Sequence, residues 1–255
     1  MIKNYLNMEL KDLVSSLNAY LNIAHICESA INGLQVKAHP HVKHIALAVS
    51  ANMRTIETAR TINADTLIVH HGLYWGKENL PISGIFGQRI QALLKNNINL
   101  IAYHLPLDVH PIVGNNAQLG LLLNLTATPD PSITPHGLLY RSQTTTTLEF
   151  LLKSIAHSIN PHVKYYPSDK VMNKEINTIA WCSGAGGDLI EQAGAQCLIT
   201  GEIAERHFDL AKEMGTTLIT AGHYATERCG IQRLGLWIEE TLNVKTTFIE
   251  SESPL

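Results

Sequence analysis

The sequence is poor in charged residues, lacks closely paired cysteines and has no long apolar run. Charged residues make up 16% of the 255 and the formal net charge is −3, so the composition gives no support to an electrostatic nucleic-acid binder. No apolar run approaches the roughly 20 residues that span a bilayer, and the first residues are typical of a polar helix rather than a secretory signal. The four cysteines form no CxxC pair, which is typical of a reduced protein. We therefore expect a globular cytoplasmic protein.

The first half of the chain alternates between short apolar runs and amphipathic segments. Residues 45–49, 67–69 and 100–103 are typical of buried strands, because they are apolar throughout and short. Helical spacing of apolar residues separates them, through 53–62 and again through 88–97. This alternation predicts an α/β fold with a largely parallel sheet.

The same pattern returns after a proline-rich stretch at 126–135, which is the best candidate for a linker. Thr147 is placed to cap a helix there, and residues 64–70 and 100–104 correspond to 195–201 and 218–223. Similarity this short also arises by chance in α/β proteins. We predict two related lobes produced by a degenerate duplication, residues 1–125 and 126–255, with a site between them to which the segment from about 220 contributes ligands.

Two adjacent histidines end the second apolar run. His70 and His71 follow 66–69 directly, and neutral histidine is the commonest nitrogen ligand of metals in proteins. Successive side chains of a strand point to opposite faces, so the two rings converge only where the strand breaks, or else serve two different ions. We expect Gly72 to give the backbone the freedom to turn there.

Two further histidines, His104 and His223, are each followed four residues later by a carboxylate. If a helix runs through His223 and Glu227, both lie on one face of it, whereas Pro106 predicts that the segment from His104 to Asp108 is a loop. One open catalytic metal usually takes three protein ligands, so a larger set suits two ions that share a carboxylate. The sequence thus predicts two divalent ions (zinc, manganese or iron), with Glu227 as the best bridge and with these ligands: His70, His71, Asp108, His223 and Glu227.

Other polar residues near the predicted strand ends have roles that the sequence leaves open. His104 and His110 fit a partner of a ligand, a proton donor to substrate or a structural histidine equally well. Glu202 occupies the position in the second half that corresponds to His71 in the first half. The sequence leaves open whether its side chain projects into the cleft. The glycine-rich run at 184–187 is more typical of a tight turn than of a phosphate-binding loop, because it has no P-loop lysine.

Six short motifs, in order along nearly the whole chain, resemble those of the GTP cyclohydrolase I type 2 homologue family of dinuclear metal-binding proteins, in its short bacterial form. They lie at 32–36, 68–72, 104–108, 114–117, 200–202 and 222–227. The resemblance implies that His70 and Asp108 hold one ion, that His71 and His223 hold the other, and that Glu227 bridges them. It also implies a ring-shaped homohexamer whose sites face an internal cavity.

The predicted centre suits hydrolysis, because two divalent ions activate water at neutral pH. We expect a metal-dependent hydrolase that acts on a small anionic substrate, a nucleotide or a damaged nucleotide base, with His104 or His110 transferring a proton. The alternative is a metal-binding adaptor protein without catalysis. A weaker third hypothesis, a ring that encloses DNA, is disfavoured by the net charge. No membrane association is expected.

Overall fold

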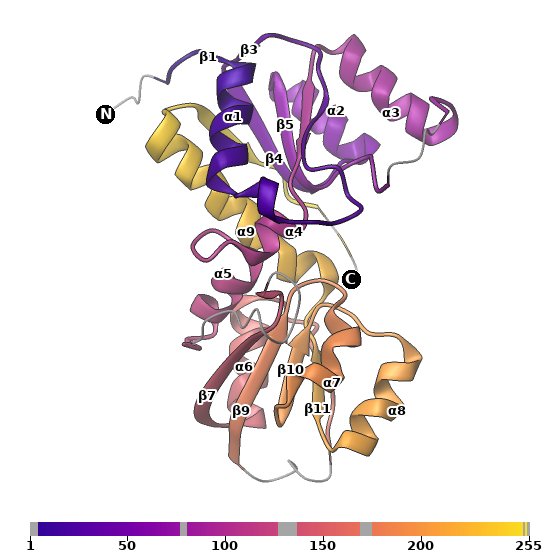
Figure 1. The fold of residues 1–255 in the computed structure, drawn as a ribbon, viewed down its shortest axis with the longest axis vertical. Helices are drawn as coiled ribbons and strands as arrows, with labels where there is room; N and C mark the ends of the chain where they lie inside the picture. The colour runs from indigo at the N-terminus through magenta and orange to yellow at the C-terminus, as the bar shows by residue number, and fades with distance from the viewer. Residues whose placement is uncertain (1–4, 77–80, 127–136, 169–174, 252, 254–255) are drawn as a thin grey trace. The chain divides into compact units, whose positions relative to one another are not determined.

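Two five-stranded sheets, one in each of two compact units, organise the part of the chain that the computed structural model describes, residues 5–76, 81–126, 137–168, 175–251 and 253 (Figure 1). The first unit comprises Met1–Leu107 and Ile231–Glu252, and the second comprises Asp108–Gly230 with Ser253–Leu255. The chain passes between the units within two helices, α4 (Leu105–Val109) and α9 (His223–Trp237).

In the first unit, three parallel strands form the centre of the sheet, and a further strand lies at each edge. The strand order is β12–β4–β5–β6–β2, in which only β2 is antiparallel to its neighbour. The strands are β2 (Gly33–Val36), β4 (His44–Ser50), β5 (Thr66–His71), β6 (Asn99–Ala102) and β12 (Lys245–Phe248). The helical segments are α1 (Leu10–Tyr20), η1 (Ile23–His25), α2 (Met53–Thr61), α3 (Gly84–Lys95) and η4 (Ile238–Leu242), and a small antiparallel pair joins β1 (Met8–Glu9) to β3 (His41–Val42).

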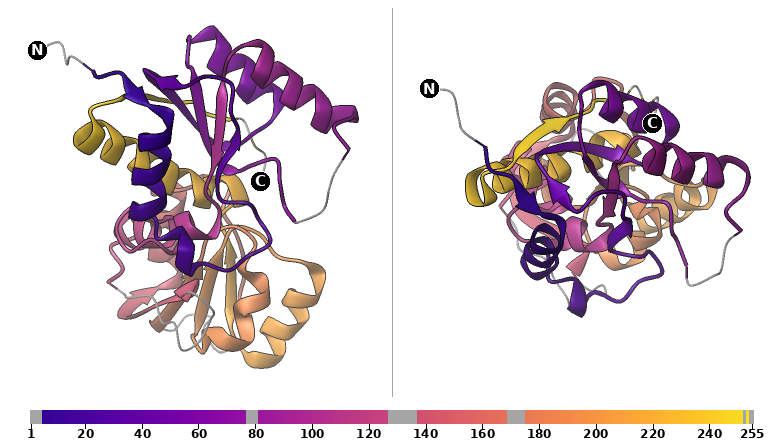
Figure 2. Two further views of the ribbon diagram at one scale, coloured as in Figure 1. Left: turned by 45° about the horizontal axis from the view of Figure 1, so that its top comes forward. Right: turned by 90° about the horizontal axis from the view of Figure 1, so that it is seen from above.

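Alternation along β5 sends its side chains into two different layers. Leu67 and Val69 pack into the core cluster that also contains Ile56 of α2 and Leu93 of α3. Ile68 and His70 therefore point to the opposite face of the sheet. Figures 1 and 2 show α2 and α3 together on one side of this sheet and α1 on the other. The unit is thus a layered α/β structure with helices on both faces.

The second unit repeats this arrangement with strand order β7–β9–β10–β11–β8. Its central strands β9, β10 and β11 are parallel, and β8 is antiparallel to β11, as β2 is to β6. The strands are β7 (Tyr140–Thr147), β8 (Lys164–Tyr166), β9 (Glu175–Cys182), β10 (Cys197–Thr200) and β11 (Thr217–Thr220). The helices are α5 (Asn115–Leu122), α6 (Leu148–Ser158), η3 (Gly186–Leu189), α7 (Ile190–Ala193) and α8 (Glu205–Met214). One core cluster joins the sheet to α5 and α6, and another joins it to α7 and α8.

The predicted α/β class is confirmed, and the segments matched in the sequence occupy equivalent positions in the two sheets. β5 and β10 are each the central parallel strand, and β6 and β11 each follow it. The outer neighbours of β4 and β9 differ, because β12 is parallel to β4 whereas β7 is antiparallel to β9. This shared order of parallel strands is what a duplication of one α/β unit would produce.

The division of the chain differs from the predicted lobes, 1–125 and 126–255. Residues from Asp108 onward pack with the second unit, and Ile231–Glu252 returns to the first because β12 pairs with β4. A short terminal strand carries little sequence signal of which sheet edge it joins. The proposed linker at 126–135 lies, apart from Thr126, outside the described residues.

The expectation that residues 104–108 form a loop is wrong, because Leu105–Val109 is the short helix α4. Pro106 lies in its first turn, where a helix does not need the N–H that proline lacks. The backbone N–H of Leu107 donates to the carbonyl of His104 at 2.8 Å, which closes this turn. Among the described helices, none combines the length and the hydropathy needed to cross a membrane.

The N-cap of α6 gives a direct test of the second unit. Thr147 Oγ1 accepts a hydrogen bond from the backbone N–H of Phe150 at 3.2 Å, as its position in the sequence predicts. Thr147→Ala removes this acceptor, so we expect the free energy of unfolding in urea to fall by about 1 kcal/mol. Thr147→Ser keeps a hydroxyl and serves as the matched control, with the stability of the native protein. Equal stability of both variants would contradict the assigned cap.

Candidate metal centre

Three histidines meet at the carboxyl ends of two neighbouring parallel strands in the first unit. His70 and His71 are the last residues of β5, and His104 follows β6 by two residues. One ring nitrogen from each lies within 4.8 Å of the other two. The ring centroids are 4.6 Å apart for His70 and His71, and 5.1 Å apart for His70 and His104. The adjacent histidines do converge at the strand end, and they are joined by a third that the sequence left undecided.

Hydrogen bonds fix the orientation of each ring in this cluster. His70 Nδ1 donates to the carbonyl oxygen of Tyr103 at 3.0 Å, and His104 Nδ1 donates to Glu28 Oε2 at 2.5 Å. In the neutral ring, the lone pair is then on Nε2 in both. His71 Nδ1 lies 3.1 Å from the hydroxyl of Ser50. Histidines that bind metals in proteins are commonly held in this way, with the second ring nitrogen donating to a carbonyl or a carboxylate.

Glu28 is the residue of this cluster that the sequence analysis missed. Its carboxylate accepts from Asn32 Nδ2 at 2.7 Å and from the backbone N–H of Leu105 at 3.0 Å, in addition to His104. Burial by itself would raise the pKa of Glu28, but these hydrogen bonds together hold the pKa below its ordinary value. An ionised, buried carboxylate therefore orients His104. The sequence offered no sign of it, because 76 residues separate the two partners.

Gly72 is needed for space rather than for a turn. A Cβ atom at this position would overlap the side-chain amide of Gln35 and would lie 2.6 Å from Ala102 Cβ. Gln35 is fixed in turn, because its Oε1 accepts from the backbone N–H of Leu73 at 2.7 Å. Gly72 is not among the glycines with positive φ. The expectation that Gly72 gives the backbone freedom to turn is therefore wrong. A glycine is needed there because Gln35 and Ala102 leave no room for a side chain.

A second cluster of candidate ligands lies in the second unit, at the start of α9. The helix begins at His223, so Glu227 follows one turn later on the same face, as predicted. His223 Nε2 is 3.1 Å from Glu227 Oε2, and His223 Nδ1 is 3.2 Å from Glu202 Oε1. Glu202, left open by the sequence, follows β10 and faces the imidazole. Both ring nitrogens of His223 thus meet a carboxylate.

Close packing of the backbone surrounds the carboxylates of this unit. Gly184 has φ +61°, and a Cβ atom there would overlap Glu227 Oε1. The run at 184–187 is a tight turn, as the sequence favoured, and it closes over Glu227. Asp108 Oδ1 accepts from Asn115 Nδ2 and from Ser183 Oγ, each at 2.9 Å. Asp108 and Glu227 are both buried, so the second unit holds two carboxylates in fixed positions.

His110 belongs to a turn rather than to either cluster. Its Nδ1 accepts from the backbone N–H of Ile112 at 3.2 Å and of Val113 at 3.1 Å. These contacts favour the structural role of His110 among those the sequence left open.

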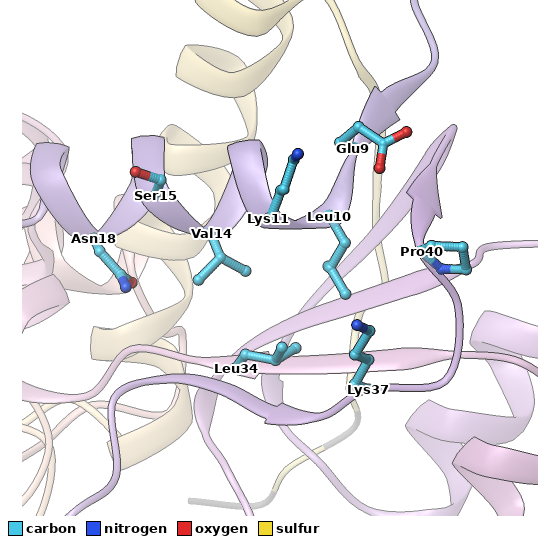
Figure 3. A pocket seen from close by; sticks show the side chains of 9 residues that line it. All are labelled: Glu9, Leu10, Lys11, Val14, Ser15, Asn18, Leu34, Lys37 and Pro40. Atoms are coloured by element: carbon cyan, nitrogen blue, oxygen red, sulfur yellow. The ribbon is translucent and has the colours of Figure 1, made fainter.

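A groove of about 490 Å³ lies between α1 and the chain around β2, and none of the predicted ligands lines it. Figure 3 shows Val14 of α1 and Leu34 of β2 facing each other across it, with Lys11 and Lys37 nearby. At one end is Asn18, whose Oδ1 accepts from the hydroxyl of Tyr103 at 2.7 Å. The groove and the histidine cluster therefore share Tyr103 as a structural neighbour.

Comparison with known proteins identifies the family. The sequence model of the Duf34/NIF3 (NGG1p interacting factor 3) family matches residues 8–254. The chain belongs to this family. A Pyrococcus abyssi protein named "GTP cyclohydrolase 1 type 2 homolog" is 40% identical over 253 residues, which cover 97% of this chain and 100% of the relative. An Escherichia coli K12 protein of the same name is 37% identical over 97% of this chain and 99% of its own length.

Solved structures show the same fold. One described as "protein ybgI, unknown function" has a TM-score of 0.91 and 35% identity, and the match covers 97% of this chain and 100% of that one. TTHA1606 from Thermus thermophilus has a TM-score of 0.85 and 32% identity, with the same coverage. The resemblance drawn from the sequence motifs is thus confirmed over nearly the full length of this Duf34/NIF3 chain.

The charge states in the Duf34/NIF3 protein favour nitrogen and oxygen ligands. The hydrogen bond to Glu227 is the main cause that raises the pKa of His223 to about 9, against burial, which lowers it. All four cysteines are free, and burial together with Asp108 and Glu227 raises the pKa of Cys182 far above its ordinary range. Cys182 therefore stays a neutral thiol. The donor set suits a divalent ion that accepts imidazole and carboxylate.

The raised pKa of His223 is measurable by NMR in the metal-free protein. We expect its ring to titrate near pH 9, because Glu227 and Glu202 stabilise the imidazolium. The stability from this pair is fully present below the unfolded pKa of about 6.5 and is lost as the pH rises through about 9. Glu227→Gln should lower the pKa of His223 more than the matched change Glu202→Gln does. A larger effect of Glu202→Gln would contradict the conclusion that Glu227 is the main cause of the raised pKa of His223.

Proposed function

We propose that this Duf34/NIF3 protein binds two divalent metal ions and is a metal-dependent hydrolase. The observation that carries the proposal is the cluster of His70, His71 and His104, in which three imidazole nitrogens lie within 4.8 Å of one another. Imidazole nitrogens placed so closely are suited to bind a metal ion. His70 donates its Nδ1 proton to the carbonyl of Tyr103, so its Nε2 carries the lone pair that a metal binds, while His104 donates its Nδ1 proton to Glu28.

In this proposal both clusters contribute to one dinuclear centre. His70 and Asp108 would hold one ion, His71 and His223 would hold the other, and Glu227 would be shared by both, as the family resemblance implies. Asp108 follows His104 by only four residues, so the chain connects the two clusters directly through α4. The contacts of Asp108 with Asn115 and Ser183 hold its carboxylate in a fixed position, as a metal ligand requires.

His223 makes the proposed binding of metal depend on pH. In the metal-free protein its two ring nitrogens face Glu227 and Glu202, so the ring holds a proton that a cation must replace. His223 and Glu227 would hold a divalent ion once that proton has left, and Glu202 would keep the ring oriented. Metal affinity consequently falls with decreasing pH.

The proposed substrate is a small anion, a nucleotide or a damaged nucleotide base. The proposed carboxylate ligands Asp108 and Glu227 neutralise two of the four positive charges of two divalent ions, while Glu202 and Glu28 contact His223 and His104 rather than the ions, so an anionic group can complete the centre. When bound, the ions supply Lewis acidity and activate water for hydrolysis. His104, supported by Glu28, is better placed than His110 to hold or move a proton, because the Nδ1 of His110 is engaged by two backbone N–H groups.

We also propose that the protein assembles as a homohexamer, which rests on the family resemblance alone. Its mass in solution tests this part independently of the metal centre. The adaptor role without catalysis is the alternative outcome of the activity test below.

Metal content tests the dinuclear centre. Purified protein should hold about two divalent ions per chain by elemental analysis, and His70→Ala or Glu227→Ala should lose at least one of them. His162→Ala, which removes an exposed imidazole of the second unit, is the matched control and should keep both. Circular dichroism checks that each variant is folded. Fewer than about one ion per chain in the native protein, or no loss in the folded variants, would overturn the proposal.

Turnover tests the hydrolase. A panel of nucleotides and of oxidised or alkylated nucleobases should contain a substrate for the metal-loaded protein. Glu227→Gln keeps the shape of the side chain but removes its charge, so we expect activity to fall about 100-fold. If the metal-loaded protein turns over no member of the panel, the hydrolase is refuted and the non-catalytic alternative is favoured.

A further inference from the structure

Trp75 is a large aromatic side chain that stays exposed beside the histidine cluster. Its relative exposure is 45%, although burial of an indole is strongly favourable. Its ring centroid lies 5.0 Å from that of His104, in an edge-to-face arrangement at 79°, and 5.6 Å from that of His71. The indole is therefore in contact with two members of the cluster while nearly half of its surface faces solvent.

The chain before Trp75 is anchored, so the position of the indole is set by the fold. The backbone N–H of Leu73 donates to Gln35 Oε1 at 2.7 Å, and the carbonyl of Tyr74 accepts from the N–H of Ile31 at 3.1 Å. The ring of Tyr74 packs edge-to-face on Phe86 at 5.2 Å. Three successive residues, 73–75, are thus held by different contacts. A side chain exposed on an anchored segment costs little entropy when a ligand covers it.

We propose that Trp75 is a stacking platform for a planar heteroaromatic ring, so that the site takes nucleotide-like ligands whose polar part faces the histidines. The inference rests on the proposed function and narrows its substrate class. Aromatic side chains bind bases of any sequence through their π faces. The indole lies beside the imidazoles of His71 and His104, so its aromatic face neighbours the proposed metal centre. A base that carries a phosphate group matches both features, whereas an aliphatic phosphate matches only the charge.

Tryptophan fluorescence gives a readout of this contact that does not depend on turnover. The chain has three tryptophans, of which Trp181 is buried and Trp237 stacks on Tyr20 at a centroid distance of 3.9 Å. Titration of the metal-loaded protein with purine nucleoside monophosphates should quench the emission of Trp75. Ribose 5-phosphate is the matched probe, because it has the sugar and the phosphate but no ring, and it should not quench.

Substitutions assign the signal to Trp75. The quenching should disappear in Trp75→Phe and persist in Trp237→Phe. In calorimetric titrations, Trp75→Ala should weaken nucleotide binding about tenfold or more, and Trp75→Phe, which keeps a smaller aromatic face, should weaken it less. Metal content should remain unchanged in all three variants, because Trp75 is not a proposed ligand.

The inference is overturned by unchanged quenching in Trp75→Phe, by unchanged affinity in a folded Trp75→Ala variant, or by equally tight binding of ribose 5-phosphate. A Trp75→Ala variant with a smaller mass in solution and unaltered nucleotide affinity would assign Trp75 to a subunit contact, which also overturns it. Nucleotide binding that depends on Trp75 without any turnover supports the inference and refutes the hydrolase. Turnover of a nucleotide with unchanged KM in Trp75→Ala refutes the inference alone.

Discussion

The proposed centre depends on the hydrogen bonds that orient the imidazoles at the ends of β5 and β6. The carbonyl of Tyr103 takes the Nδ1 proton of His70, and Glu28 takes that of His104. Without these acceptors, the rings are free to rotate or to change tautomer, and the lone pairs no longer point to a common place. The parallel sheet supplies the first acceptor directly, because Tyr103 follows β6 next to the strand that carries His70.

Both units place polar side chains at the same structural position, but with different chemistry. In the first unit, the ends of β5 and β6 carry imidazoles, whereas in the second unit the ends of β10 and β11 carry Glu202 and His223. The two sheets share the order of their parallel strands, so equivalent strand ends occupy equivalent positions although their side chains differ. The first unit carries imidazole nitrogens there, and the second also holds the buried carboxylates of Asp108 and Glu227.

The sequence predicted what depends on local periodicity. The central strands, the cap at Thr147 and the shared face of His223 and Glu227 follow from spacing along the chain. It did not predict what depends on distant partners. Glu28 meets His104 across 76 residues, and β12 joins the first sheet only through its pairing with β4. The error at α4 has a different cause. Proline breaks a helix in its interior, but Pro106 lies in the first turn, where proline is tolerated.

The central claim is that two ions are bound by side chains drawn from both units. A crystal structure of the metal-loaded protein, with anomalous scattering recorded at the absorption edge of the bound metal, tests it most directly. The account predicts two anomalous peaks in each chain, one beside His70 and Asp108 and the other beside His71 and His223, with Glu227 between them. A single peak, or peaks bound by other residues, would contradict it.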